Sequence, residues 1–247
     1  MNFLDTLKPS GPGEENAPRG NARSAAMRSA TVTAASALAT SARAAIKPRP
    51  APEPPFLGEN CTIVLTDVVG YGSYQRNDRD RRTIRAAHQD MMQATLGDQW
   101  KKERTRDRGD GLLVVVPPAF PTITVMERLH RNLPEELRRH NDAHDEPVRF
   151  QLRMAVHVGP VTTDAVGWSG EVIIRTARLL DAPVLKEAMA STGASLGVIV
   201  SMFVYETAIR HAEDWAGQDS YNEVEAHVKE FRTNAWMQLI DVAQPAT

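Results

Sequence analysis

The sequence predicts an α+β fold over residues 58–243, and three observations support this prediction. Short apolar segments with the pattern of buried strands alternate with longer segments whose apolar residues recur at helical spacing. Gly- and Pro-containing turns separate these segments. Two pairs of strand-like segments are joined by tight turns and not by helices, as in β-hairpins. Hairpins among mixed strands and helices favour an α+β sandwich over a doubly wound parallel sheet.

The expected elements follow in order along the chain. The expected strands are 63–66, a hairpin of 101–106 with 112–116, 150–158, 196–201, and a closing hairpin of 224–228 with 236–239. The first expected helix is capped by Asn77 or Asp78 and ends at Gly97. The second contains Val125, Leu129 and Leu133 and is interrupted or restarted at Pro134. Two further helices are expected over 170–185 and 202–211. The strand over 150–158 is expected to end at Gly159-Pro160.

Residues 1–57 differ in composition from the rest of the chain. Segment 22–46 is rich in Ala, Ser and Thr, and Lys47–Pro55 is expected to be a stiff, polyproline-like linker. We interpret 1–57 as a disordered, low-complexity tail with a Pro-rich linker. An organelle transit peptide is an alternative that the acidic Asp5 and the missing cleavage signal disfavour, and a short partner-docking helix within 22–46 is another.

The bulk composition limits the possible functions. A formal net charge of −2 is not the electrostatic signature of a nucleic-acid-binding protein. Cys61 is the single cysteine, which excludes an intrachain disulfide framework and a Cys–His zinc site and fits a reducing compartment. No apolar run approaches the length of a membrane span. We therefore expect a soluble, cytoplasmic protein whose partners include neither nucleic acid nor membrane.

Two acidic residues stand where an apolar strand meets a tight turn. Asp67 follows the apolar run that begins at Thr62, and Asp110 lies between Gly109 and Gly111, just before a second apolar run. If the two strands are neighbours, the carboxylates meet and repel each other unless a cation lies between them. Hard oxygen ligands of this kind favour Mg²⁺ or Mn²⁺. The pair therefore predicts metal-assisted chemistry on a phosphate ester.

The turn after Asp67 reads Val-Val-Gly-Tyr-Gly-Ser. Gly70 and Gly72 let the backbone approach a ligand closely and direct N–H groups toward it, which suits a polyphosphate. A plain structural turn is the alternative interpretation. Beside the carboxylate pair, we favour the phosphate interpretation.

Several charged side chains have both a functional and a structural interpretation. Arg153, Arg175 and Arg178 are candidates for stabilising charge on phosphorus oxygens, and the two helical arginines are otherwise solvated surface charges. We interpret the charge run 76–85 as a solvated face, with contact of Arg79 or Arg82 with phosphate as the alternative. His157, on an apolar strand, is interpreted as a satisfied core histidine and not as a base.

Four segments resemble motifs of the class III nucleotidyl cyclases. TDVVGYGS and RGDGLLVVV are similar to the two metal motifs of that family, RMAVHVGPVTTD resembles its Arg-X-Gly-Ile-His strand, and GEVIIRTARLLDAP resembles its Asn- and Arg-bearing helix. They occur in the family's order over residues 60 to about 240. The resemblance implies a ferredoxin-like βαββαβ core, a catalytic domain over 58–243, and a head-to-tail homodimer with active sites at its interface.

The resemblance also implies the roles of individual residues. By the resemblance, Asp67, Asp110 and the carbonyl of Val68 bind two Mg²⁺ or Mn²⁺ ions, and the Gly70–Gly72 amides bind the β- and γ-phosphates. Arg178 comes from the partner subunit and stabilises the transition-state charge, and Lys229 binds phosphate. Three positions depart from the family pattern. Ile174 replaces the ribose-positioning Asn, Arg106 replaces a base-selecting Lys, and Gly167 replaces a base-selecting Asp. Because reading adenine needs both base-selecting residues, ATP is disfavoured as the substrate.

The departures point toward a smaller base. We expect this base to be enclosed by Tyr71, Trp168 and Arg106, with the gap at Gly167. Both aromatics have an alternative role in the core. The segments DVVGYG, DRGDG and RLLDAP are similar to those of the pyrimidine cyclases of Pycsar anti-phage systems. That similarity implies conversion of UTP or CTP to 3′,5′-cyclic UMP or cyclic CMP plus pyrophosphate, as a second messenger of antiviral defence read by a separate effector protein.

Two alternatives to this function stay open. One is a catalytically weak, cyclase-like regulatory domain that binds nucleotide, because Ile174 cannot supply a positioning hydrogen bond. The other is a purine cyclase, adenylate or guanylate, with different base contacts.

Overall fold

The computed structural model describes residues 55–212 and 220–241, so nearly all of the expected tail and linker lies outside the described residues. The strands are β1 Leu57–Val68, β2 Thr105–Asp107, β3 Gly111–Val116, β4 Leu152–Thr163, β5 Trp168–Ser169, β6 Leu196–Ser201, β7 Asn222–Val228 and β8 Phe231–Ile240. The helices are α1 Asp78–Leu96, α2 Thr122–Ala143, α3 Glu171–Leu180, α4 Pro183–Thr192 and α5 Met202–Val204, with 3₁₀ turns η1 Gly97–Gln99 and η2 Lys102–Arg104 and a π-helical turn η3 Tyr205–Ile209.

One mixed sheet organises these elements. Its strand order is β2-β3-β1-β4-β6-β8-β7, with β5 paired to β4. Strand β1 is antiparallel to both β3 and β4, β4 is parallel to β6, and β6 is antiparallel to β8. The β2–β3 and β7–β8 hairpins form the two edges. The predicted α+β class is confirmed.

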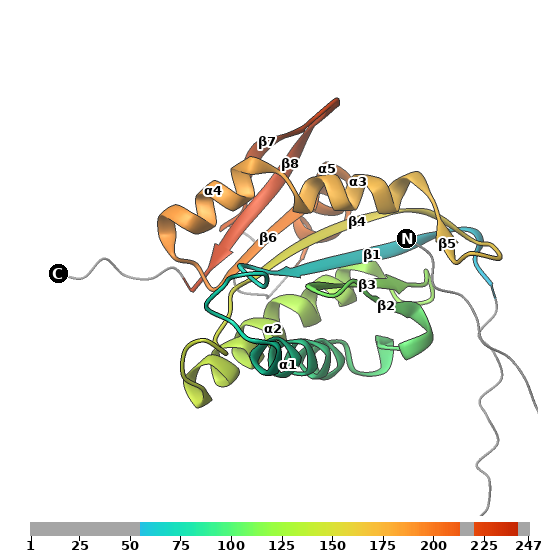
Figure 1. Cartoon of the computed structure of the whole chain (residues 1–247). Coiled ribbons are helices and arrows are strands. Elements are labelled where there is room, and N and C mark those ends of the chain that lie inside the picture. Colours follow the sequence, from blue (N-terminus) through green and yellow to red (C-terminus); the bar gives the residue numbers. More distant parts are fainter. Residues whose placement is uncertain (1–54, 213–219, 242–247) are drawn as a thin grey trace, which may run out of the picture. The chain divides into compact units, whose positions relative to one another are not determined.

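The central strand β1 is buried on both faces. Val64 and Val68 belong to a core cluster with residues of α1 and α2, whereas Ile63 and Leu65 belong to a cluster with residues of α3 and α4. Successive strand residues point to opposite faces, so β1 feeds both clusters. Figure 1 shows the two helix pairs on opposite sides of the sheet. A strand packed in this way holds its carboxyl end, where Asp67 lies, in a fixed position.

Helix α1 begins and ends where the sequence predicts. The Asn77 side chain accepts hydrogen bonds from the N–H groups of Arg79 and Asp80 at 2.8 and 3.1 Å. The Asp80 carboxylate accepts one from the Asn77 N–H at 2.9 Å, which completes a capping box. Gly97 ends the helix at a φ of 57°. The loop between β1 and α1 is therefore anchored at its far end.

Proline positions account for three errors in the predicted boundaries. Helix α2 runs through Pro134, because the ring removes only one backbone donor while the apolar stripe continues to Leu137. The helix predicted over 170–185 is split, since Pro183 starts a second helix and disfavours helical geometry in the residue before it. Strand β4 continues past Pro160, which lies between the residues that pair with β6 and those that pair with β5.

Two other segments differ from expectation in detail. Residues 102–104 form η2, so the predicted strand over 101–106 is reduced to β2. The segment predicted as a helix over 202–211 contains the π-helical turn η3. Over the ranges 55–212 and 220–241, no helix is both long enough and apolar enough to cross a bilayer.

Candidate functional site

Asp67 and Asp110 meet at one end of neighbouring strands. Asp67 pairs with Gly111 in the β1–β3 register, and the Val68 N–H donates to the Asp110 carbonyl oxygen at 2.8 Å. The Asp67 side chain is 17% exposed, whereas Asp110 is exposed at the hairpin turn. The antiparallel register thus places one partly buried and one accessible carboxylate at the same end of the sheet.

Burial and neighbouring charges both act on the Asp67 carboxyl group, and burial has the largest effect. Burial raises the pKa of this carboxyl group, the ion pair with Arg153 lowers it, and the nearby charges of Asp110 and Asp181 raise it again; the net direction is upward. Arg153 is one of three arginine candidates for stabilising charge on phosphorus oxygens, and in the structure its guanidinium pairs with Asp67. No sequence pattern points to Asp181, which ends α3 and pairs with Lys186 at 3.0 Å. A bound cation would stabilise the charged form of this partly buried carboxylate.

The donor set at this end of the sheet consists of oxygen atoms. Besides the two carboxylates, the Val68 carbonyl is available, and its one hydrogen bond from the described residues is a long one, 3.4 Å, from the Tyr71 N–H in the turn. Within the described part of the chain, no group of three or more His, Cys, Asp or Glu side chains forms a ready-made metal site. Mg²⁺ needs no such group, because it keeps several waters and takes further ligands from substrate phosphates. The residues present therefore fit Mg²⁺ or Mn²⁺.

The turn after Asp67 leaves two amides free. The Ser73 N–H donates to the Gly70 carbonyl at 3.0 Å, and the Tyr71 N–H is directed to Val68. The N–H groups of Gly70 and Gly72 have no hydrogen-bond partner among residues 55–212 and 220–241. Gly70 has a φ of 65°, a left-handed conformation that favours glycine. Of the three amides predicted to bind phosphate, two are thus free of internal partners and that of Tyr71 is not.

Tyr71 lies beside this turn with its ring packed against the core cluster that includes α1. Its hydroxyl donates to the Arg81 carbonyl at 3.3 Å. These contacts agree with the alternative interpretation of Tyr71 as a core aromatic. Its contact with a base stays a prediction.

Arg106 and Trp168, both predicted to contact the base, lie against each other. The guanidinium carbon of Arg106 is 4.1 Å from the ring centroid of Trp168. Phe56 meets the same indole edge-on at 6.3 Å between centroids. The preceding turn holds Gly167 at a φ of 148°, and the Asp164 carboxylate accepts the N–H groups of Val166 and Gly167 at 2.8 and 2.9 Å. Asp164 is therefore engaged by its own turn.

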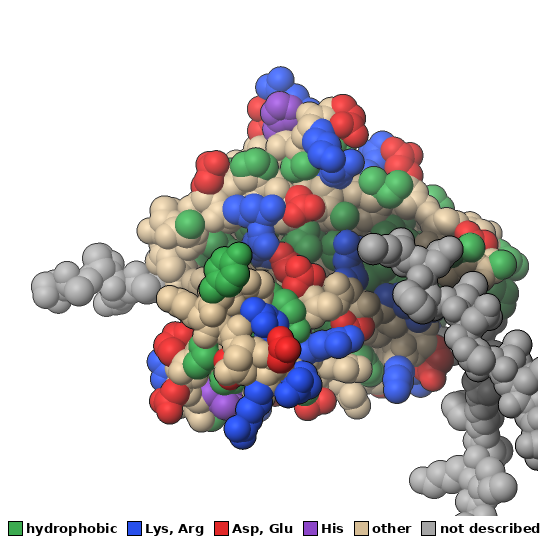
Figure 2. Space-filling model, viewed as in Figure 1, with side chains coloured by type: hydrophobic (Ala, Val, Ile, Leu, Met, Phe, Trp, Pro, Cys, Tyr) green, Lys and Arg blue, Asp and Glu red, His purple; other side chains and the backbone are tan. Residues whose placement is uncertain are grey.

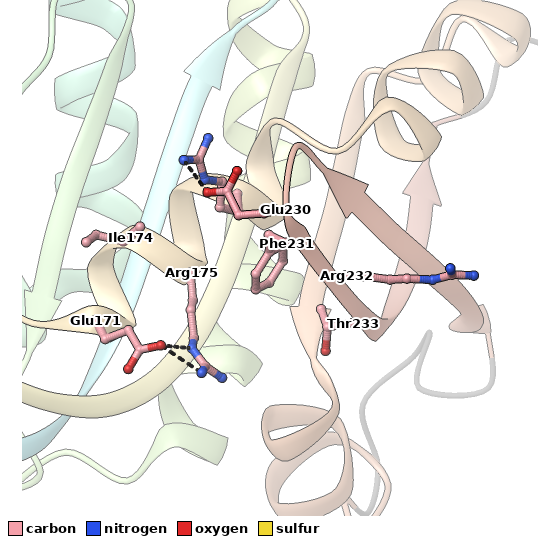
Figure 3. A pocket seen from close by; sticks show the side chains of 8 residues that line it. Glu171, Ile174, Arg175, Glu230, Phe231, Arg232 and Thr233 are labelled. Atoms are coloured by element: carbon pink, nitrogen blue, oxygen red, sulfur yellow. Dashed lines mark hydrogen bonds and ion pairs between the residues drawn. The ribbon is translucent and has the colours of Figure 1, made fainter.

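A second group of predicted residues surrounds a cavity of about 350 Å³ between α3 and the β7–β8 turn (Figure 3). Its lining residues are Glu171, Ile174, Arg175, Arg178, Glu230, Phe231, Arg232 and Thr233. Arg178 forms an ion pair with Glu230 at 3.6 Å, and Arg175 one with Glu171 at 2.8 Å. Lys229 precedes Glu230 in the turn, at a φ of 55°. Arg178 is thus paired at this cavity and not with either carboxylate of the Asp67–Asp110 pair.

Two interpretations of single side chains need correction. His157 is half-buried, but its Nδ1 atom has no hydrogen-bond partner among the residues that the structure describes, so it is not satisfied. Burial and the nearby Arg175 lower its pKa. Within the charge run 76–85, Arg79, Arg82 and Arg85 are exposed as predicted. Arg76 and Arg81 are exceptions, because their guanidinium groups donate to backbone carbonyls.

The face of the molecule seen in Figure 2 carries side chains of both charges. Figure 2 shows acidic side chains near its centre with Lys and Arg side chains around them. Such an arrangement suits a ligand that brings both metal cations and phosphate anions.

The sequence matches no family model, and it matches no curated protein. Solved structures are similar to it. One is an adenylate/guanylate cyclase/hydrolase from Silicibacter pomeroyi, with 15% identity, a TM-score of 0.53, and coverage of 75% of this chain and 99% of that one. Another is the guanylyl cyclase Cya2, with 13% identity, a TM-score of 0.51, and coverage of 78% and 97%.

A third similar structure is a bacterial light-regulated adenylyl cyclase, with 12% identity, a TM-score of 0.54, and coverage of 78% of this chain and 55% of that one. At these identities the likeness establishes the fold alone. The chain therefore has the fold of a class III nucleotide cyclase catalytic domain, as its four sequence segments predict.

Proposed function

We propose that the chain is a pyrimidine nucleotide cyclase, which converts UTP or CTP to 3′,5′-cyclic UMP or cyclic CMP and pyrophosphate. The observation that carries the proposal is the Asp67–Asp110 pair beside a turn whose Gly70 and Gly72 amides lack internal partners. Carboxylates for cations next to free amides for anions are the two halves of a nucleoside triphosphate site.

Asp67, Asp110 and the Val68 carbonyl would hold two Mg²⁺ or Mn²⁺ ions, and when bound these supply the positive charge that activates the ribose 3′-hydroxyl and stabilises the leaving pyrophosphate. The Gly70 and Gly72 amides would donate to the β- and γ-phosphates. This contact orients the α-phosphate in line with the attacking hydroxyl.

The proposal requires a homodimer with active sites at its interface. Arg178 lines the α3 cavity and Lys229 stands next to Glu230 in the adjoining turn, so the proposal needs a second copy of the chain to bring them to the substrate held by Asp67 and Asp110. There Arg178 would stabilise the negative charge that develops on the transferred phosphate, and Lys229 would contact phosphate. Ile174 is 60% exposed and Phe203 52% exposed near this cavity, which is apolar surface suited to a partner.

Pyrimidine preference is the finer part of the proposal. It is supported by the Arg106–Trp168 stack, by the position of Gly167, and by the engagement of Asp164 in its own turn. No Lys–Asp pair at these positions is present to read adenine. By the sequence similarity, the product would act in the cytoplasm as a second messenger of antiviral defence through a separate effector protein.

A panel of the four ribonucleoside triphosphates tests the proposal. Purified full-length protein is incubated with each triphosphate and Mn²⁺, and products are identified by mass spectrometry. We expect cyclic UMP or cyclic CMP as the main product. Comparable turnover of ATP or GTP would overturn the pyrimidine assignment, and no cyclic product from any triphosphate would overturn the activity.

Two other functions have a specific observation in their favour. The exposed Ile174 cannot hydrogen-bond to a ribose, which favours a regulatory domain that binds nucleotide without turnover. In that case calorimetry would detect triphosphate binding while the panel yields nothing over hours. The similar structures named as adenylyl or guanylyl cyclases favour a purine cyclase, for which the panel would yield cyclic AMP or cyclic GMP.

A further inference from the structure

The turn over residues 68–73 uses only some of its backbone groups internally. Its two internal hydrogen bonds join the Tyr71 N–H to the Val68 carbonyl and the Ser73 N–H to the Gly70 carbonyl. The carbonyls of Val69, Tyr71 and Ser73 are engaged by side chains from outside the turn. Every second carbonyl of this short turn, at Val69, Tyr71 and Ser73, therefore accepts a hydrogen bond from a side chain outside the turn. Neither a hairpin turn nor a helix cap requires such contacts.

Arg76 holds the first of these carbonyls. Its guanidinium donates to the Val69 carbonyl at 3.1 Å, to the Pro147 carbonyl at 3.1 Å and to the Arg149 carbonyl at 2.8 Å. All three of its nitrogens are thus engaged by backbone oxygens from two loops. This side chain therefore ties the turn to the loop that precedes β4.

Arg81 holds the other two carbonyls. It donates to the Tyr71 carbonyl at 3.3 Å and to the Ser73 carbonyl at 3.1 Å, and its third nitrogen forms an ion pair with Asp78 at 3.0 Å. The Tyr71 hydroxyl donates back to the Arg81 carbonyl at 3.3 Å. The first turns of α1 are thus hydrogen-bonded to the segment that precedes them.

Peptide geometry converts these contacts into amide directions. In a trans peptide unit the carbonyl of one residue points opposite to the N–H of the next. Holding the Val69 carbonyl therefore directs the Gly70 N–H away from Arg76, and holding the Tyr71 carbonyl directs the Gly72 N–H away from Arg81. These are the two N–H groups in the turn that lack a partner among the described residues.

We propose that Arg76 and Arg81 are positioning residues that fix the Gly70 and Gly72 amides in a polyphosphate-binding orientation. This inference rests on the proposed function for its ligand, a nucleoside triphosphate, but not on turnover. Each guanidinium reaches its carbonyls through several nitrogens in one plane. A lysine at either position keeps the charge but cannot make the same set of contacts.

The inference differs from a purely structural role of the two arginines. If they only tied loops together, charge-conserving substitutions would lower stability and leave the affinity of the folded protein for phosphate unchanged. If they direct the amides, the affinity for a polyphosphate falls even in a variant that stays folded. The two amides also become direct reporters of binding.

The test uses the full-length chain labelled with ¹⁵N-glycine, with inorganic tripolyphosphate and Mg²⁺ as the probe. We expect the Gly70 and Gly72 amide signals of the wild type to shift on titration. In Arg76→Lys and Arg81→Lys the dissociation constant should rise about tenfold, equivalent to about 1.4 kcal/mol. Arg139→Lys is the matched control, because Arg139 is an exposed helical arginine paired with Glu136, and its affinity should equal that of the wild type.

The outcomes separate this inference from the proposed function. Wild-type affinity in both folded lysine variants, or no response of Gly70 and Gly72 in the wild type, overturns the inference. Binding with the expected losses but no cyclic product overturns the cyclase activity and leaves the inference standing. If thermal melting shows that Arg76→Lys is unfolded, Arg81→Lys and Arg81→Gln decide, because the hydrogen bonds that the Arg81 side chain makes among the described residues go to the turn and to its own helix.

Discussion

The carboxylate end of β1 and the α3 cavity are built differently. At the β1 end, Asp67 is partly buried, paired with Arg153, and followed by a turn that two arginines hold in place. At the cavity, Ile174 is largely exposed, and Arg178 has a single long ion pair to an exposed glutamate.

In the proposed homodimer, the β1 end is the region whose geometry is fixed within one subunit. Side chains that bind a charged ligand need neighbours that fix their geometry, and the β1 end has them. At the α3 cavity Ile174 is exposed and the ion pair of Arg178 is long, so fewer neighbours fix the geometry there. In the proposed homodimer a second subunit would supply these neighbours, and the two regions would form the two halves of one composite site.

The largest effect is expected at the β1 end. Asp110→Asn removes one of the two carboxylates, so cyclase activity should fall on the order of a thousandfold or more. Product formation measured by mass spectrometry checks this, and chelation of the metal should cause the same loss in the wild type, reversed by Mn²⁺. Because Asp110 is exposed at a turn, the melting temperature should stay close to that of the wild type. A variant with most of its activity would remove the metal assignment.

The next effect is expected at the α3 cavity. Arg178→Ala should lower kcat about 100- to 1000-fold with little change in KM, because the guanidinium acts on charge that develops in the transition state. Arg232→Ala is the control, since Arg232 lines the same cavity but projects away from α3 and pairs with Glu225 (Figure 3). Equal losses in both variants would indicate a general disturbance of the cavity.

A measurement of unfolding free energy tests the packing beneath the β1 end independently of turnover. His88 lies under the β1 end, with its Nε2 2.9 Å from the Thr66 hydroxyl, and burial lowers its pKa from 6.5 to about 4. The folded state therefore favours the neutral ring, and this contribution to stability is complete above pH 6.5 and is lost as the pH falls toward 4.

The expected loss over that window is on the order of 3 kcal/mol in the free energy of unfolding. Urea denaturation of the wild type and of His88→Gln at several pH values measures it, because glutamine takes up no proton. Parallel pH profiles for the two proteins would contradict the assignment.

The smallest effect concerns the base contacts. Trp168→Leu removes the ring under Arg106 and should raise KM for UTP or CTP about tenfold while kcat changes less. Val166→Ala in the same turn is the control, because Val166 is almost fully exposed. An unchanged KM in Trp168→Leu would restrict Trp168 to a structural role.

Much of the fold could be predicted because local signals determine it. Asn77 and Gly97 bound α1, and the Gly109-Asp110-Gly111 turn marks the β2–β3 hairpin. Proline positions were the least reliable signal for helix and strand ends, because the effect of a proline on an element depends on the backbone groups around it. Pro134 is tolerated within a helix whose buried face continues on both sides of it, from Val125 to Leu137.

The candidate site was predictable only where residues follow a strand or a turn. The proximity of Asp67 to Arg153 depends on antiparallel register between distant segments, and no local pattern encodes it. The roles of Arg76 and Arg81 were missed because a run of charges looks like a solvated face. Only the fold shows that these two guanidinium groups turn back onto the preceding loop.

Subunit complementation tests the composite site most directly. Asp110→Asn and Arg178→Ala, each nearly inactive alone, are unfolded together, refolded as a mixture and assayed with UTP and CTP. Random pairing of subunits in a twofold dimer leaves about a quarter of the sites with both an intact Asp110 and an intact Arg178. We predict recovery of about a quarter of wild-type pyrimidine cyclase activity. A mixture no more active than its separate components would contradict a site shared between two subunits.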